Sequence, residues 1–144
     1  MTHNPDDCIF CKIIEGTIPC AKVYEDEQVL AFLDISQSTK GHTLVIPKVH
    51  KQDVFALTPD IAAHLFSVVP GIAKAIQMEY GATGFNLLNN SGEQAGQTVF
   101  HFHLHLLPRY SKNDGFKGTL VSFQNEYTAN VLQEMAGAIA RRIE

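Results

Sequence analysis

The stretch HFHLHLLPRY, residues 101–110, holds three of the seven histidines of this 144-residue chain. His101, His103 and His105 alternate with apolar residues, which is the pattern of a strand with one buried face. In a strand over residues 99–107, neighbouring histidines share one face and lie about 6.6 Å apart. The Phe and Leu side chains occupy the other face, where they can pack on a helix. The pattern therefore predicts one core face and one chemically active face.

Three interpretations of the histidines remain open from the residues alone. A purely structural role is disfavoured, because every buried imidazole needs partners for its polar ring nitrogens. Two of the three could share a zinc ion, but all three at this spacing do not easily converge on one ion. The third interpretation is nucleophilic and acid–base catalysis on a phosphate ester, because imidazole is neutral and nucleophilic near pH 7. Crowding of the imidazoles also disfavours double protonation and keeps one of them free to attack.

A polar loop with two glycines precedes the histidines. Gly92, Gly96 and Thr98 could direct backbone N–H groups at an oxyanion, and Asn90 and Gln97 add neutral donors. Such a loop could hold a phosphate with few formal charges. A plain polar turn has the same composition, so the loop by itself leaves both interpretations open.

The rest of the chain alternates short β-type runs with helical ones. Apolar residues recur at helical spacing after Thr58 or Asp60, either of which could cap a helix, and again over residues 128–142. Pro70-Gly71 lies inside the first pattern, which predicts a kink or a local break there. The expected strands cover residues 22–25, 28–34, 42–47, 84–90 and 99–107. This order, with tight turns early in the chain, favours an α+β fold with an antiparallel sheet over a parallel βαβ fold.

Composition excludes several classes of protein. Apolar residues make up 45% and charged residues 18% of the chain, and the net charge is −4, which is an ordinary globular balance. The length suits one domain over residues 1–144. Lys and Arg are scattered and form no basic stripe, so no nucleic-acid partner is expected. No apolar run approaches the ~20 residues of a membrane span, and the N-terminus does not read as a secretory signal, so we expect a cytoplasmic protein without a membrane partner.

Four segments of the chain resemble the histidine triad (HIT) family, most closely its bacterial Hint-like members. GQTVFHFHLHLLPRY resembles the family signature, in which three histidines alternate with apolar residues. CIFCKIIEGTIPCAKVYEDEQVLAFLDI resembles the N-terminal hairpin of the family, GHTLVIPKVH its next strand, and GFNLLNNSGEQAGQTVFHFHLH its last two strands. The resemblance covers residues 8–110 and leaves residues 111–144 as a variable tail.

The resemblance implies a HIT-like antiparallel sheet meander with a central helix and a C-terminal helix, usually paired as a homodimer. It implies hydrolysis of nucleoside 5′-monophosphate derivatives, of the AMP type, through a nucleotidyl-histidine intermediate. His103 would be the nucleophile, His105 would position the phosphate and protonate the leaving group, and His101 and His42 would orient the site. The implied purine nucleotide contacts are Asp34 for the ribose, Phe10, Ile18, Phe32 and Ile35 for the base, and Asn90, Gly96 and Thr98 for the phosphate, beside Gln97 of the same loop.

An imidazole attacks through one nitrogen only when the other nitrogen is fixed by an acceptor. A backbone carbonyl near His101 is a candidate acceptor for His103, because the two residues are neighbours on the predicted face. Such a bond would leave the second nitrogen of His103 facing the phosphorus atom.

Cys8 and Cys11 are separated by two residues, a spacing that indicates metal or redox chemistry in a reducing compartment. No thioredoxin-like βαβ context surrounds the pair, and a tetrahedral zinc needs two further ligands, for which His50 and His101 are candidates. Bacterial family members carry the same set, so the resemblance implies a structural zinc held by Cys8, Cys11, His50 and His101. Cys20 has no evident partner and is interpreted as a small apolar residue.

Two alternatives to a phosphoramidase-like hydrolase stay open. One is a dinucleoside polyphosphate hydrolase, and the other is a zinc-bearing nucleotide-binding or interaction module with little turnover. Residues 107–110, Leu-Pro-Arg-Tyr, stand where the best-known Hint-like members carry a glycine pair. Arg109 could reach a second phosphate or simply be solvated. This departure and the length of the tail bear on the leaving group, so the sequence does not name the substrate.

Overall fold

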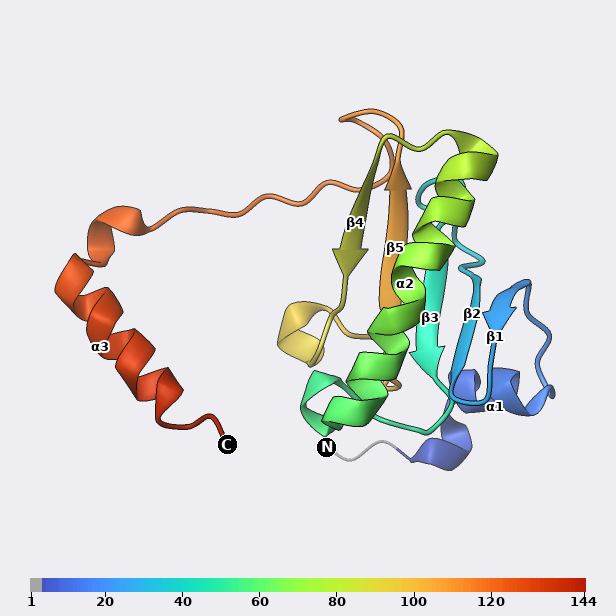
Figure 1. The fold of residues 1–144 in the computed structure, drawn as a ribbon, viewed down its shortest axis with the longest axis horizontal. Helices are drawn as coiled ribbons and strands as arrows, with labels where there is room; N and C mark the ends of the chain where they lie inside the picture. Colours follow the sequence, from blue (N-terminus) through green and yellow to red (C-terminus); the bar gives the residue numbers. More distant parts are fainter. Residues whose placement is uncertain (1–3) are drawn as a thin grey trace.

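The computed structural model describes residues 4–144 and contains a five-stranded antiparallel sheet with a long helix on one face (Figure 1). The strands are β1 (Lys22–Glu25), β2 (Val29–Leu33), β3 (Thr43–Pro47), β4 (Gly84–Leu88) and β5 (Leu104–Arg109). The helices are α1 (Ile9–Glu15), α2 (Pro59–Tyr80) and α3 (Ala129–Ala140). Short 3-10 helices are η1 (Pro5–Asp7), η2 (Val54–Ala56), η3 (Glu93–Ala95) and η4 (Gln124–Glu126). The sheet order is β1-β2-β3-β5-β4. The predicted α+β fold with an antiparallel sheet is confirmed. It departs from a simple meander at one place, because β5 lies between β3 and β4.

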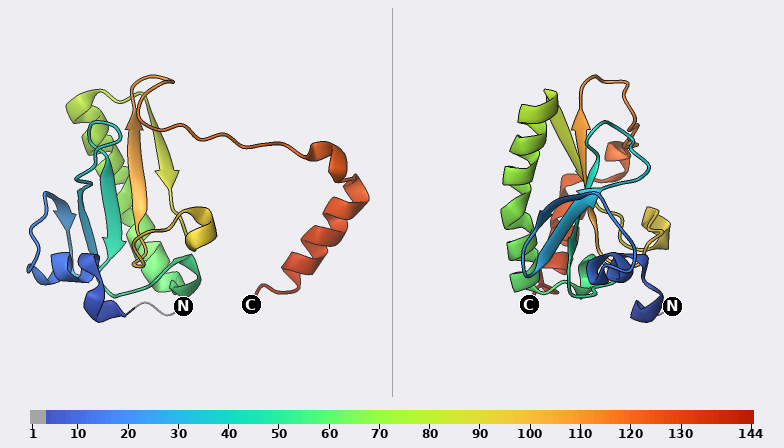
Figure 2. Two further views of the ribbon diagram at one scale, coloured as in Figure 1. Left: turned by 180° about the vertical axis from the view of Figure 1, so that it is seen from behind. Right: turned by 90° about the vertical axis from the view of Figure 1, so that its right-hand side faces the viewer.

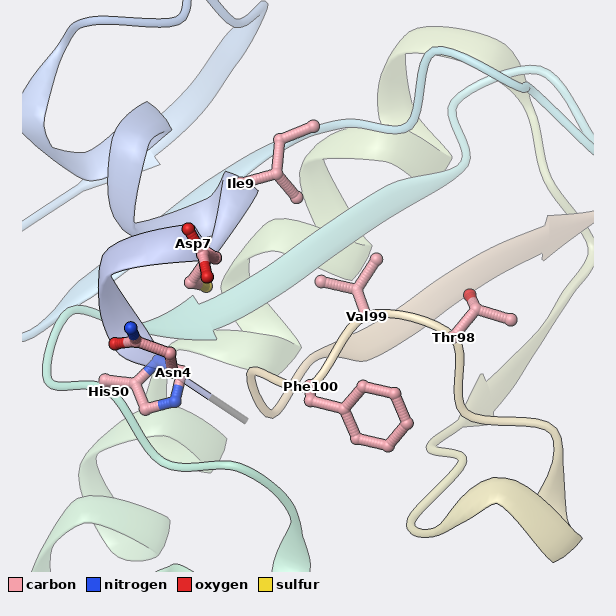
Figure 3. A pocket seen from close by; sticks show the side chains of 8 residues that line it. Asn4, Asp7, Ile9, His50, Thr98, Val99 and Phe100 are labelled. Atoms are coloured by element: carbon pink, nitrogen blue, oxygen red, sulfur yellow. The ribbon is translucent and has the colours of Figure 1, made fainter. Parts of the chain in front are cut away.

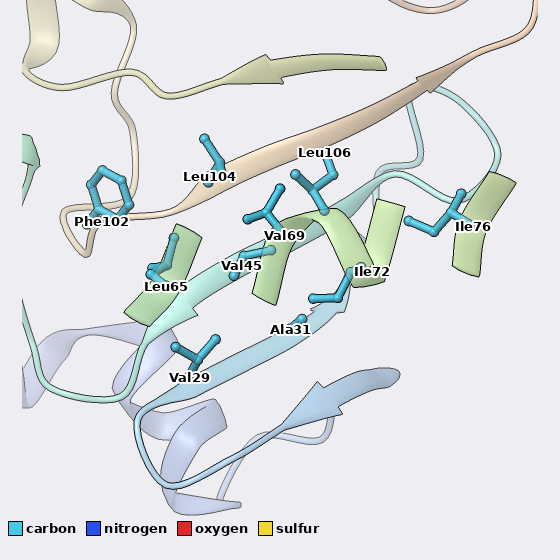
Figure 4. Close-up of a cluster of buried hydrophobic side chains, with 10 residues drawn as sticks. All are labelled: Val29, Ala31, Val45, Leu65, Val69, Ile72, Ile76, Phe102, Leu104 and Leu106. Carbon is cyan, nitrogen blue, oxygen red and sulfur yellow. The ribbon is translucent and has the colours of Figure 1, made fainter. Parts of the chain in front are cut away.

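The main core lies between α2 and the sheet (Figure 4). Leu65, Val69, Ile72 and Ile76 form the buried stripe of α2. They pack against Val29, Ala31, Val45, Phe102, Leu104 and Leu106 of the sheet and of the segment that leads into β5. By length and apolar composition α2 is a helix that could cross a membrane. In this fold its apolar stripe is instead covered by the sheet.

Helix α2 runs without interruption through Pro70, so of the predicted kink or local break, the break is not found. Proline in a helix interior costs roughly 3 kcal/mol, because it removes one backbone hydrogen bond and crowds the preceding turn. Buried residues lie on both sides of it, Val69 before and Ile72 after. Their core contacts hold both halves of the helix on the same sheet, and this explains why the helix continues.

The predicted strand over residues 99–107 is shifted in the structure, because β5 begins only at Leu104. The N–H of Phe102 donates to the carbonyl of Lys51, and the carbonyl of His103 accepts from the side-chain amide of Asn89. These bonds go to loops and not to a neighbouring strand. His101 and His103 therefore precede the regular strand, and only His105 lies within it, which corrects the expectation of three histidines along one strand.

The opposite face of the sheet carries the second core cluster. Phe10 of α1 packs there with Leu30, Phe32, Leu44 and Ile46. Figure 2 shows α1 and the turn around η3 on this face, away from α2. After β5 the chain makes a turn held by Asp114 and then leaves the body in an arm over residues 117–128, which includes η4. The arm leads to α3, which stands apart from the sheet (Figures 1 and 2).

The turn between β1 and β2 depends on Asp26. Its Oδ1 accepts from the N–H groups of Gln28 and Val29 at 2.8 Å each, and its Oδ2 lies 2.8 Å from both Tyr24 Oη and His64 Nε2. Burial alone would raise the pKa of the Asp26 carboxyl, but these four hydrogen bonds together hold its pKa well below the usual range. The carboxylate therefore contributes stability above about pH 4, and that contribution is lost as the solution becomes more acidic.

Changing Asp26→Ala is expected to lower the free energy of unfolding by about 1–2 kcal/mol, because two turn N–H groups lose their acceptor. Urea denaturation at neutral pH measures the change. The Asp26→Asn variant keeps an acceptor oxygen and is expected to lose less than half as much. Equal losses in the two variants would contradict this role of the turn acceptor.

Candidate active site

A cavity of about 390 Å³ opens on the sheet face opposite α2. Its walls come from α1 and the segment that follows it, the end of β2, the loop over residues 90–99 and the histidine segment. Of the residues that the sequence singled out, the cavity brings together Phe10, Ile18, Phe32, Asp34, Ile35, Asn90, Gly96, Thr98, His103 and His105. These residues are far apart in the chain, so only the folded sheet forms the site.

Gln97 lies outside this cavity, because its side chain is buried and engaged in the loop. Its Oε1 accepts from the N–H of Gly92 at 2.7 Å, and its Nε2 donates to the carbonyls of Gln52 at 2.7 Å and Val99 at 3.1 Å. The amide thus holds the loop in shape. The structure shows this internal role for the Gln97 side chain, and its contact with a nucleotide stays a prediction.

The backbone N–H groups that the sequence suggested for an oxyanion are those of the loop around Gly92, Gly96 and Thr98. The N–H of Gly96 donates to Glu93 and the N–H of Gln97 donates to Gly92, both within the turn around η3. Gly96 has a φ of 90°, a backbone conformation that residues other than glycine rarely adopt. The predicted N–H donors of Gly92 and Gly96 are therefore used inside the loop, and Thr98 and Asn90 remain as polar residues that line the cavity there.

The ring of His103 is fixed by its own segment. Nδ1 of His103 lies 2.8 Å from the carbonyl oxygen of His101, so it carries the proton and donates. The predicted bond to a carbonyl near His101 is present. Phe10 packs edge-on against the His103 ring, with centroids 5.1 Å apart. Burial lowers the pKa of His103, and the bond to His101 offsets this only in part, so the imidazole is neutral near pH 7 and its Nε2 has a free lone pair.

His42 and His105 form a second chain of imidazoles behind the cavity. The N–H of Ser38 donates to Nδ1 of His42 at 3.3 Å, so the proton of His42 lies on Nε2. Nε2 of His42 lies 2.8 Å from Nδ1 of His105 and donates to it. Nε2 of His105 must then carry the proton of that ring, which makes it a donor. Burial, with smaller contributions from His103 and His42, lowers the pKa of His105 to about 4.

Asp34 follows β2 directly and contributes a carboxylate to the cavity wall. Its Oδ1 accepts from the N–H of Ser36 at 2.8 Å, and its Oδ2 lies 3.7 Å from Nε2 of His42. A carboxylate has room to accept from two vicinal hydroxyls in addition. Ile35 is fully exposed at the rim beside it, so the apolar part of the cavity is open on one side.

Cys8, Cys11, His50 and His101 lie together at the other end of the histidine segment. Sγ of Cys8 lies 3.4 Å from Nδ1 of His101, and Sγ of Cys11 lies 3.3 Å from Nδ1 of His50 and 3.6 Å from Nδ1 of His101. Tetrahedral zinc, with bonds of roughly 2.3 Å to sulfur and 2.0–2.1 Å to nitrogen, places the two ligand atoms about 3.6 Å apart. The four side chains therefore have the spacing that a zinc ion requires.

The orientation of His101 supports this use of its ring. Nε2 of His101 donates to the carbonyl of Pro47 at 2.7 Å, so Nδ1 presents its lone pair to the two thiols. Such an outer hydrogen bond commonly orients a metal-binding histidine. His101 is fully buried and lies outside the cavity, and its carbonyl joins it to His103 by accepting from Nδ1 of that ring.

The HIT domain family profile matches residues 15–112, about two thirds of the chain. The chain belongs to the HIT domain family. His50 and His101 of the Cys and His cluster lie inside the matched range, whereas Cys8 and Cys11 precede it.

Solved structures of HIT proteins share this fold. A HIT family protein from Bacillus anthracis has a TM-score of 0.95 and 70% identity, covering 98% of this chain and 100% of that chain. A Zn-bound histidine triad family protein from Mycobacterium smegmatis has a TM-score of 0.73 and 36% identity, covering 94% of this chain and 99% of that chain.

Two relatives are similar in sequence. "Protein hit" of Bacillus subtilis is 55% identical and covers 98% of this chain and 97% of its own length. Adenosine 5′-monophosphoramidase hnt1 of Schizosaccharomyces pombe is 43% identical and covers 75% of this chain and 78% of its own length.

Two features of this HIT protein were not visible in the sequence. Cys20 lines the cavity beside Ile18, although it was interpreted only as a small apolar residue. Ser38 sets the tautomer of His42 through its backbone N–H, and a backbone contact leaves no signal in residue type.

Arg109 is bound to Asp114 and Asn86 at 2.6 Å each and lies outside the cavity, so it does not reach toward a second phosphate there.

A second cavity of about 430 Å³ lies beside the Cys and His cluster (Figure 3). Cys8 and His50 line it, so the cluster can be reached from solvent on this side. It shares Ile9, Thr98 and Val99 with the first cavity, and these residues form the wall between the two. Burial, followed by the interaction with Cys8, raises the pKa of the Cys11 thiol to about 12 in the protein alone.

Proposed function

We propose that this HIT protein is a nucleotide-binding hydrolase that cleaves AMP-type nucleoside 5′-monophosphate derivatives, with a preference for phosphoramidates. The observation that carries the proposal is the state of His103, whose Nδ1 donates to His101 and whose Nε2 is thereby a free nucleophile at the cavity. Asp34 and the apolar Ile18 and Phe32 offer contacts for ribose and base in the same cavity. The Schizosaccharomyces pombe relative, named an adenosine 5′-monophosphoramidase, supports the substrate class.

The reaction would proceed in two displacements at phosphorus. Nε2 of His103 attacks the α-phosphorus, the bond to the leaving group breaks, and the leaving nitrogen departs as the amine with a proton taken from water, while the Nε2–H of neutral His105 donates a hydrogen bond to a phosphoryl oxygen. Water then attacks the same phosphorus, the bond to His103 breaks, and the proton lost by the water passes to solvent. The Nδ1–H bond to His101 stabilises the positive charge that His103 carries while it is bound to the nucleotide.

A substrate panel on the purified protein tests the proposal. Turnover of adenosine phosphoramidate, with AMP as product, is expected to exceed turnover of diadenosine polyphosphates. The opposite preference would identify a dinucleoside polyphosphate hydrolase. AMP binding with no turnover of any compound would identify a binding module and overturn the proposal.

Asp34 is expected to recognise the ribose hydroxyls. The Asp34→Ala variant should lower AMP affinity by about 10-fold, which corresponds to the loss of hydrogen bonds to a charged acceptor. Calorimetry with AMP and 2′-deoxy-AMP measures how much the ribose 2′-hydroxyl contributes to affinity, and this difference does not depend on a change in the stability of the variant. If Asp34 accepts from the ribose, the variant should bind both nucleotides equally, while the wild-type protein prefers AMP. An unchanged preference in the variant would exclude this contact.

We further propose that Cys8, Cys11, His50 and His101 hold a structural zinc ion. Support comes from the 3.3–3.6 Å spacing of their ligand atoms and from the Zn-bound relative of Mycobacterium smegmatis. With four protein ligands the ion would have no open position, so its contribution would be structural. It would join α1 to the histidine segment and so keep Phe10 against His103.

We expect a homodimer. β4 is an edge strand of the sheet, and Leu87 on it is half exposed, so its backbone groups are available for pairing with a second chain. Light scattering at micromolar concentration should return twice the chain mass of 15.9 kDa. A mass equal to one chain across the range would contradict the expectation.

A further inference from the structure

The C-terminal helix packs against no other element within residues 4–144, the part of the chain that the structure describes. No residue of α3 is buried, and every hydrogen bond of residues 117–144 is made within that segment. Figures 1 and 2 show α3 standing away from the sheet on the side of β4, at the end of the extended arm. Residues 117–144 therefore lie outside the core that stabilises the body.

The helix nevertheless has an exposed apolar face. Val131, Leu132, Met135 and Ile139 lie on one side of α3 at helical spacing and are between 37% and 62% exposed. Gln133 lies on the opposite side. An isolated helix of twelve residues is marginal in water, so α3 needs a surface against which this face can pack.

The path of the arm is shared with a solved relative. Residues 111–144 are about a quarter of the chain. The Bacillus anthracis structure has a TM-score of 0.95 with 98% of this chain covered, which requires that its arm take the same course. Because the arm takes the same course in a related protein, its conformation is defined, and this indicates that α3 binds at a specific site.

A complementary groove lies on the body. It has a volume of about 340 Å³ and lies between η2, the first turns of α2 and the end of β4. Its apolar lining includes Val54, Leu57, Ala62, Phe66, Phe102 and Leu104. Phe66 and Val54 are each 47% exposed at the rim, so apolar surface is available to a helix.

We propose that α3 of one chain docks its Val131, Leu132, Met135 and Ile139 face in this groove of a second copy. The occupant is a second chain because the arm carries α3 past the β4 edge and away from its own body (Figure 1). Each chain has one helix and one groove, so a two-fold exchange satisfies both at once and closes the assembly. The inference rests on the homodimer expected above and adds the contact that joins its subunits.

Photo-cross-linking of the full chain tests the exchange. p-Benzoylphenylalanine is placed at Met135, on the apolar face, or at Gln133, on the opposite face, as the matched control. The Met135 probe is expected to give covalent dimers in which the attachment lies within residues 54–66 or 102–104 of the other chain. Attachment within the same chain, attachment elsewhere on the second chain, or no attachment would overturn the proposal.

A charge placed on the same face gives an independent measurement. Met135→Glu should raise the dimer dissociation constant by at least about 10-fold, whereas Gln133→Glu should change it by less than about 2-fold. Equal constants for the two variants would overturn the proposal. AMP phosphoramidate turnover is measured in the same samples, so a failure of the exchange and a failure of the hydrolase proposal are told apart.

Discussion

Changing His103→Ala is expected to lower kcat by at least about 10³-fold, the size of loss seen when a nucleophile that acts as part of a unit is removed. The reason lies in the position of its Nε2, which the bond from Nδ1 to the His101 carbonyl turns toward the cavity as a free lone pair. Among the histidines of residues 4–144, no other imidazole has the same arrangement. His105 has its Nδ1 occupied as an acceptor from His42, so its Nε2 carries a proton and cannot attack.

Steady-state turnover of adenosine phosphoramidate and AMP affinity by calorimetry measure the two consequences. AMP affinity should change little, because the proposed ribose and base contacts come from Asp34, Ile18 and Phe32. His64→Ala is the matched control, since His64 is half exposed, binds Asp26 and lies outside the cavity. A His103→Ala variant that kept more than a tenth of wild-type turnover would exclude covalent catalysis at this residue.

Local patterns in the sequence predicted the strands well, and the failures occur where hydrogen-bond partners are distant. Alternation and β-branched residues placed β1 to β3 within a few residues of their observed bounds. Residues 99–103 alternate equally well, but their partners are Lys51 and Asn89 in loops, which no local pattern encodes. Helix α1 was not predicted, although Ile9, Phe10, Ile13 and Ile14 have helical spacing and Gly16, with φ of 87°, ends it.

The same distinction applies to the site. The bond from His103 to His101 was predictable, because the two residues are two positions apart. The bond between His42 and His105 joins residues 63 positions apart, and the use of Gln97 inside its loop depends on Gln52. Residue types therefore indicated which chemistry to expect, while the tautomers and the hydrogen bonds inside the loop required the fold.

Loss of the proposed zinc should have the largest effect on stability. The cluster joins Cys8 and Cys11 at α1, His50 after β3 and His101 beside the nucleophile, so removing the ion frees the N-terminal segment from the sheet. An ion bound far above its dissociation constant stabilises the folded state by several kcal/mol. For a chain of this size that corresponds to a Tm lower by about 10 °C or more.

Metal analysis and thermal melts of Cys11→Ser test this prediction. Wild-type protein purified without added metal or chelator should contain one zinc per chain and the variant should contain less than about a tenth of that, which is the primary result. Cys11 is the better choice, because Sγ of Cys8 also accepts from the N–H of Cys11 as the cap of α1. Cys20→Ser is the matched control, since Cys20 lies outside the cluster.

A chelator, which can reach Cys8 and His50 through the second cavity, should lower the Tm of the wild-type protein to that of Cys11→Ser and leave the Tm of Cys11→Ser unchanged. Wild-type protein that lacked zinc, with Cys8 and Cys11 freely reactive toward thiol reagents, would exclude the site.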